Sequence, residues 1–102
     1  MKNLVIIIHA NAQQDMADLL RGLEQIHGFT FSHVEGHGVQ VEQDPFLSAR
    51  DKVVGYTPRV RVDIILQDAD LDSALDALRA TGKGAEGHRL YWVTAVEQSG
   101  RL

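Results

Sequence analysis

The chain has 102 residues, a formal net charge of -4 at pH 7 and no cysteine. This length suits one domain, residues 1–102, because a single hydrophobic core commonly takes roughly 100 to 150 residues. The acidic balance argues against a nucleic-acid partner, since binding phosphates requires clustered Lys and Arg. The lack of cysteine excludes disulfides, thiolate metal ligands and thiol catalysis, and it is compatible with the cytoplasm, where we expect the protein to act.

The first half of the chain predicts a strand followed by a helix. Leu4–Ile8 is a short, β-branched apolar run, which indicates a central strand covered on both faces and is too short to insert into a membrane. The helix is expected to begin at Asn11, an N-cap residue with Gln14 three positions on, and to end at Gly28. Its apolar stripe consists of Met16, Leu19, Leu20, Leu23 and Ile26.

Two further strands are indicated by alternation of side chains. In residues 29–35, one side carries Phe29, Phe31, His33 and Glu35. In residues 59–66, which follow Pro58, one side carries Val60, Val62, Ile64 and Leu66, and the opposite side carries Arg59, Arg61 and Asp63. Each pattern predicts a strand with two chemically different faces.

The last third predicts a second helix and a fourth strand. The helix is expected to begin at Asp68 or Asp70 and to end at Thr81–Gly82, with Leu71, Leu75 and Leu78 on its apolar stripe. The strand covers residues 90–96. The order β-α-β-β-α-β is typical of α+β ferredoxin-like folds, in which both helices cover one face of an antiparallel four-stranded sheet. The other face then needs cover, which we expect a second subunit to provide.

A long connection joins the second and third strands. Residues 36–55 give about 20 positions where a tight hairpin would suffice, and long loops in compact domains are usually functional. We therefore predict a functional loop, with an extended and twisted hairpin as the alternative.

Three ionisable side chains precede this loop at alternate positions. If the strand continues to His37, then His33, Glu35 and His37 point to one side, and imidazole and carboxylate groups can bind a divalent zinc, copper or nickel ion. The alternative is a solvated or interface strand end, because Gly36 and Gly38 can end the strand first.

The glycine-rich segment 82–87 matches G-x-G-x-x-G, but it follows a helix and precedes a strand, the reverse of the dinucleotide-binding context. It is either a plain connector or a backbone nest that binds an anion with help from Lys83, His88 and Arg89.

The sequence offers no recognisable catalytic motif. No Ser, His and Asp residues are spaced as a catalytic triad, and residues 9–22 lack an Arg-bearing phosphate loop. We therefore predict no enzymatic activity, with a small acylphosphatase-like enzyme as the less favoured alternative.

Three segments resemble the nitrogen-regulatory PII superfamily: residues 28–38, 53–63 and 93–97. The likeness is strongest at Gly36-His37-Gly38 and at Pro58–Asp63, and it is closest to short PII-like proteins encoded near heavy-metal efflux systems. It implies a ferredoxin-like homotrimer with its sheets packed inward and effector clefts between subunits. The loop 36–55 would be the T-loop that contacts a protein partner, either a membrane transporter or an efflux component, and the glycine segment would be the B-loop.

The resemblance also assigns effector-binding positions. Gln40 falls where family members hold nucleotide phosphates and magnesium, and Arg101 falls on a phosphate-contacting position, so an adenine nucleotide is one expected ligand. The full set is Gly36, His37, Gly38, Gln40, Arg59, Asp63, Gly87, His88, Arg89 and Arg101.

Two further expectations follow for assembly and for metals. Trimerisation would cover the sheet face that bears Phe29 and Phe31, and it would pair Arg59, Arg61 and Asp63 with neighbouring subunits. The alternative function is a divalent-metal sensor or a CutA-like metal tolerance protein that uses His33, Glu35 and His37.

Overall fold

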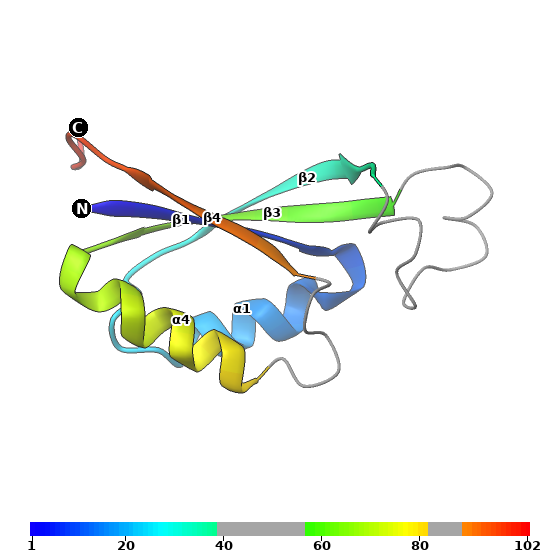
Figure 1. Ribbon diagram of the computed structural model, residues 1–102, viewed down its shortest axis with the longest axis horizontal. Helices are drawn as coiled ribbons and strands as arrows, with labels where there is room; N and C mark the ends of the chain where they lie inside the picture. The colour runs from blue at the N-terminus through cyan, green and yellow to red at the C-terminus, as the bar shows by residue number, and fades with distance from the viewer. Residues whose placement is uncertain (39–56, 82–88) are drawn as a thin grey trace.

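The computed structural model describes residues 1–38, 57–81 and 89–102 (Figure 1). Within these ranges the helices and strands are β1 (Lys2–His9), α1 (Gln13–Arg21), β2 (Thr30–Gly36), β3 (Thr57–Leu66), α4 (Leu71–Ala80) and β4 (Leu90–Ala95). A short 3-10 turn precedes each helix, η1 (Ala10–Ala12) before α1 and η2 (Asp68–Asp70) before α4. The order β-α-β-β-α-β confirms the prediction from sequence.

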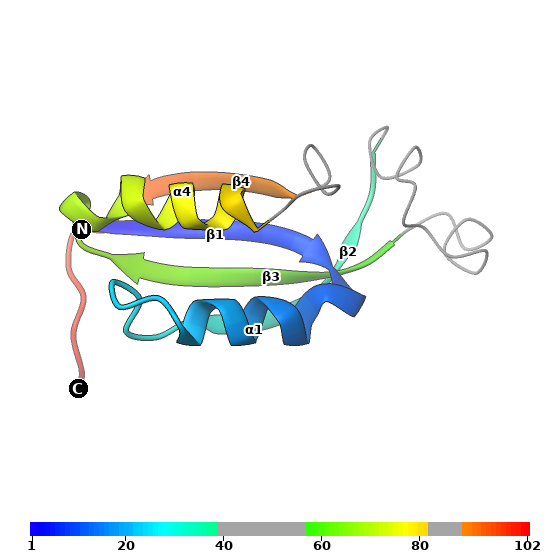
Figure 2. The same ribbon diagram turned by 90° about the horizontal axis from the view of Figure 1, so that it is seen from below.

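The strands of the described residues form one antiparallel sheet in the order β2-β3-β1-β4. Both helices lie on the same face of this sheet, as Figures 1 and 2 show from two directions. β1 pairs with β3 on one side and with β4 on the other, which confirms it as a central strand. This is the ferredoxin-like α+β arrangement. No helix in the described ranges is both long and apolar enough to cross a membrane.

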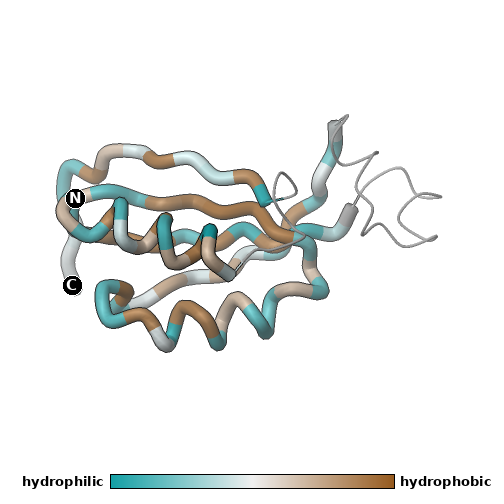
Figure 3. The backbone as a smooth tube through the Cα atoms, turned by 60° about the horizontal axis from the view of Figure 1, so that its bottom comes forward, coloured by the Kyte–Doolittle hydropathy of each residue, from teal (hydrophilic) through white to brown (hydrophobic). Residues whose placement is uncertain are grey.

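The hydrophobic core lies between the sheet and the helices. The alternation predicted for β3 is correct, because Val60, Val62 and Ile64 are fully buried on the helix side of the sheet. Val60 and Ile64 pair in register with Ile8 and Leu4 of β1, which are equally buried. The helices contribute Met16, Leu20, Ala74 and Leu78. Figure 3 shows the apolar run of β1 as a brown stretch in the middle of the sheet. Burial of this single apolar layer is the main source of stability.

The first helix is shorter than its apolar spacing predicts. α1 ends at Arg21 with Gly22 as its C-cap, so Leu23 and Ile26 lie in the connection to β2, where Ile26 is still buried. The predicted N-cap was also wrong. Asn11 lies inside η1, and its backbone N–H donates to Nδ1 of His9 at 3.2 Å. The N-cap of the regular helix is instead Ala12, one position further along the chain.

The second helix agrees with its predicted limits. Asp70 is the N-cap residue of α4 and Thr81 is its C-cap. The Oγ1 hydroxyl of Thr81 donates to the carbonyl of Leu78 at 3.1 Å, which satisfies one of the carbonyls left unpaired at a helix end.

The prediction that Phe29 and Phe31 lie on the sheet face covered by neighbouring subunits was wrong. Both rings pack against the core on the helix side of the sheet, with ring centres 5.3 Å apart, because Phe31 pairs in register with the buried Val62. The face that carries no helix, here named the open face, bears the alternate residues. By register it consists of Asn3, Val5, Ile7 and His9 from β1, Thr30, Ser32 and Val34 from β2, Arg59, Arg61, Asp63 and Ile65 from β3, and Leu90, Trp92 and Thr94 from β4.

Candidate functional site

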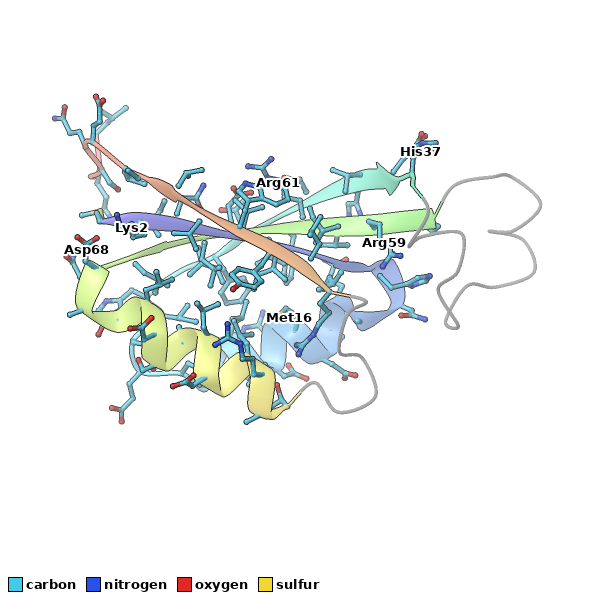
Figure 4. All side chains as sticks on the ribbon, in the orientation of Figure 1. Lys2, Met16, His37, Arg59, Arg61 and Asp68 are labelled. Atoms are coloured by element: carbon cyan, nitrogen blue, oxygen red, sulfur yellow. The ribbon has the colours of Figure 1, made fainter. Side chains whose placement is uncertain are left out.

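The glycine pair predicted to close β2 lies where the sheet ends. Gly36 pairs with Thr57 in the last register position of β2 and β3, so the strands enter and leave the 36–55 loop side by side. Gly38 has a φ of 130°, a conformation that L side chains rarely adopt and that glycine tolerates. His37 lies between them, at the tip of β2 in Figure 4. The motif therefore makes a turn with little side-chain bulk at the base of the loop.

The structure brings together two of the three predicted metal ligands. His37 Nε2 lies 3.3 Å from Glu35 Oε2, and both side chains are more than half exposed. Among residues 1–38, 57–81 and 89–102, no group of three His, Cys, Asp or Glu side chains is placed to hold a metal ion. His33 therefore does not join the pair in this conformation.

Arg59 lies close to the base of the loop but inside the sheet. It follows Thr57 by two positions in β3, and in register it lies between Val34 of β2 and His9 of β1. Only 5% of the residue is exposed. Arg59 is therefore a buried residue of the sheet, two positions along β3 from the residue that pairs with Gly36.

Asp63 is bound within the chain in the middle of the open face. It accepts hydrogen bonds from Arg61, with Nε to Oδ2 at 3.0 Å and Nη2 to Oδ1 at 3.0 Å, and from Asn3 Nδ2 at 3.2 Å. The bond from Arg61 lowers the pKa of the Asp63 carboxyl, and the bond from Asn3 adds to this against the opposing effect of burial. Asp63 is therefore held ionised by its neighbours on the same sheet.

Arg89 caps the second helix in this structure. Its Nη2 donates to the carbonyl of Leu78 at 2.9 Å, in the last turn of α4, where the helix dipole favours a cation. Of the other predicted B-loop residues, Gly87 and His88 lie outside the described residues, as do Gln40 and most of the loop 36–55.

The glycine turn and Arg101, two of the predicted effector positions, fall at opposite ends of one chain. The Gly36–Thr57 pair marks one end of the sheet, whereas Lys2 pairs with Leu66 and with Ala95 at the other. Arg101, which is exposed, follows β4 near that second end, where Figure 1 marks both termini. A single chain therefore does not bring Arg101 to the Gly36–Gly38 turn.

A pocket of about 220 Å³ lies at the end of the molecule that holds the termini. Met1, Gln25, His27 and Asp70 are among its lining residues, and the effector residues that the structure describes do not line it. Beside it, the N-terminal ammonium of Met1 lies 2.7 Å from Asp68, which lowers the pKa of the Asp68 carboxyl.

One contact on the open face was missed by the sequence reasoning. The guanidinium carbon of Arg61 lies 5.6 Å from the centre of the Trp92 ring. Alternation in residues 90–96 groups Trp92 with Leu90. It does not show that β4 and β3 lie on the two sides of β1. Only the strand order brings these two residues together.

Comparisons with known proteins place the chain in a family. The whole chain, residues 1–102, matches the family "Protein of unknown function (DUF3240)". The nitrogen regulatory protein P-II 1 of Methanothermobacter thermautotrophicus is 30% identical over 97 residues, which cover 94% of this chain and 84% of that protein. The nitrogen regulatory protein GlnK of Escherichia coli is 28% identical over 90 residues, which cover 85% and 80% of the two chains.

A solved structure supports the same fold. The crystal structure of a DUF3240 family protein from Shewanella baltica has a TM-score of 0.76 to this chain at 24% identity, and the likeness covers 99% of this chain and 94% of that one. The chain belongs to the DUF3240 family and is a distant homologue of the nitrogen regulatory PII proteins.

Proposed function

We propose that this protein is a non-enzymatic PII-like regulator that assembles as a homotrimer and binds a small anionic effector in clefts between its subunits. An adenine nucleotide is the first candidate for that effector. The observation that carries the proposal is the division of the predicted effector residues between the two ends of the chain, with Gly36–Gly38 at one end and Arg101 at the other.

Two features of the Gly36–Gly38 end support an anion site there. Glycines let a ligand approach backbone N–H groups closely, and Arg59, a buried cationic residue, lies two positions into the paired strand. In a closed ring, the contact surfaces on the two sides of each subunit differ. Such a contact can bring Arg101 of one copy to the glycine turn of the next, which completes a site that one chain does not form.

The loop 36–55 is the proposed output of the site. Its anchors, Gly36 and Thr57, are paired neighbours, so an effector at Gly36–Gly38 binds directly at the root of the loop. Binding energy there would bias the loop between conformations and so change the surface offered to a protein partner. We propose a membrane transporter or an efflux component as that partner, acting with the regulator in the cytoplasm.

Calorimetric titration with ATP, ADP and AMP tests this function. We expect binding that weakens at least tenfold in Arg101→Ala, because the cleft loses a phosphate contact. Arg21→Ala is the matched control, since Arg21 is an exposed helical arginine paired only loosely with Asp18, at 3.6 Å. The absence of nucleotide binding would overturn the nucleotide proposal, and equal affinities in wild type and Arg101→Ala would overturn the phosphate contact assigned to Arg101.

The same titration separates the alternatives. Zinc, copper or nickel binding that is lost in His37→Ala, without any nucleotide response, would indicate a metal sensor built on the Glu35–His37 pair. Turnover of an acyl phosphate above the uncatalysed rate would contradict the non-enzymatic function.

A further inference from the structure

Two side chains on either side of Gly36 form a close pair at the tip of β2. His37 Nε2 lies 3.3 Å from Glu35 Oε2, and both side chains are more than half exposed, with His37 labelled in Figure 4. The residues that pair in register with Glu35 and Gly36 are Pro58 and Thr57, and neither carries a charge. Across the described register, the Glu35 carboxylate therefore has an uncharged neighbour, and an ion from solution can reach both side chains.

The spacing of the two atoms is that of two ligands of one metal ion. A tetrahedral zinc ion holds imidazole nitrogen and carboxylate oxygen at about 2.0–2.2 Å, which places two such ligands about 3.3–3.5 Å from each other. The observed separation of 3.3 Å matches this geometry. An ionised carboxylate only accepts hydrogen bonds, so Nε2 carries the hydrogen of the pair, and a bound ion releases it to the solvent as a proton.

The two donor types select the class of ion. Imidazole nitrogen suits zinc, copper and nickel, whereas Mg²⁺ and Ca²⁺ prefer oxygen ligands. Exposure of the pair also leaves the remaining coordination positions open to water. An exposed ion pair contributes little to the stability of a fold, so replacement of the Glu35–His37 contact by a metal ion costs the fold little.

We propose that Glu35 and His37 bind a divalent ion of the zinc, copper or nickel class at the root of the loop 36–55. Two protein ligands hold the ion, and water completes its coordination. His33 takes no part, because no third ligand is placed with the pair in the described ranges. The inference goes beyond the proposed function, since it adds a cation to a loop for which only an anionic effector has been proposed. The ion would join the side chains on the two sides of Gly36 and so restrain the start of the loop.

Calorimetric titration of the full chain, free of any affinity tag, with zinc chloride tests this site. We expect one zinc ion per chain and no competition from an excess of magnesium. Binding should weaken at least tenfold in His37→Ala and in Glu35→Gln, which keeps the shape of the side chain and removes its charge. His27→Ala is the matched control, because His27 is also exposed but lies in the connection between α1 and β2. It should bind zinc within twofold of wild type.

The variant His33→Ala separates this site from the three-residue site predicted from sequence. It should bind zinc as wild type does, and a loss as large as that in His37→Ala would overturn the two-residue site. Absence of zinc binding, equal affinities in wild type and His37→Ala, or one ion for every two chains would also overturn it. Circular dichroism establishes that each variant is folded.

The zinc and nucleotide titrations fail separately. Zinc binding without a nucleotide response supports the Glu35–His37 site and contradicts the nucleotide proposal. Nucleotide binding without zinc binding contradicts this inference and leaves the proposed effector in place.

Discussion

The guanidinium of Arg61 lies 5.6 Å from the centre of the Trp92 ring, although β1 separates the strands that carry these two residues. The contact therefore ties β3 to β4 across the middle of the sheet. It also places the chain's one tryptophan on the open face, which we expect a neighbouring subunit to cover.

Tryptophan fluorescence should report assembly directly. Trp92 is 38% exposed in the single chain, so we expect its emission maximum to shift to longer wavelength as dilution dissociates the trimer. An emission maximum that stays constant through a dissociation seen by light scattering would show that Trp92 lies outside the interface.

Stability should depend on the charge of Asp63 at low pH. Because its pKa is lowered in the folded state, Asp63 adds stability that is fully present above the unfolded pKa of about 3.9 and is lost as the pH falls through the folded value. We expect Asp63→Asn to reduce the free energy of unfolding at pH 7 by about 1 kcal/mol. Urea denaturation at a fixed protein concentration should show this difference shrinking below about pH 4. If the difference in unfolding free energy between wild type and Asp63→Asn does not change with pH, the ionised Asp63 carboxylate is not the source of the stability.

The core should be most sensitive where α1 meets the sheet. Leu20 is fully buried, so Leu20→Ala should lower the free energy of unfolding by about 2–5 kcal/mol through lost apolar burial and a residual cavity. Urea denaturation measures this loss, and Leu102→Ala is the control because Leu102 is fully exposed. Equal effects of the two substitutions would show that the core packing described above is wrong.

Mixed trimers should recover binding that each parent lacks. If Gln40 and Arg101 act on one effector from neighbouring chains, an equal mixture of Gln40→Ala and Arg101→Ala subunits, unfolded and refolded together, should regain about one quarter of the sites. Calorimetry gives the number of recovered sites. The same mixture combined without unfolding is the control. A mixture that recovers no binding would contradict a site shared by Gln40 and Arg101 of neighbouring chains.

Sequence alone was sufficient for the order of the elements and for much of the core. The alternation of Val60, Val62, Ile64 and Leu66 identified the buried side of β3 because nearly every apolar residue of that strand lies on one face. Phe29 and Phe31 were misplaced because alternation groups residues without saying which group faces the helices. The pairing of Phe31 with Val62 of β3 decides that, and it depends on strand register.

The limits of α1 and the contacts of the candidate site could not be predicted from the sequence patterns. Apolar spacing reports which side chains are buried, and Ile26 is buried although the helix has ended before it. Arg61 was recognised from sequence as a charge on the open face, but its contact with Trp92 requires the strand order. The separation of Arg101 from Gly36–Gly38 likewise follows from topology, because β4 runs antiparallel to β1 and leaves the chain end beside Met1.

The ladder between β1 and β3 also bears on how the chain folds and diverges. It joins residues from Lys2–Leu66 to His9–Arg59, so the centre of the sheet closes only after the chain beyond the 36–55 loop has been made. Such non-local pairing slows folding. The entropy of closing a loop, however, rises only with the logarithm of its length, and a doubling costs about 0.6 kcal/mol. The segment between Gly36 and Thr57 can therefore change in length from one homologue to another, to suit different partners, with little cost to the fold.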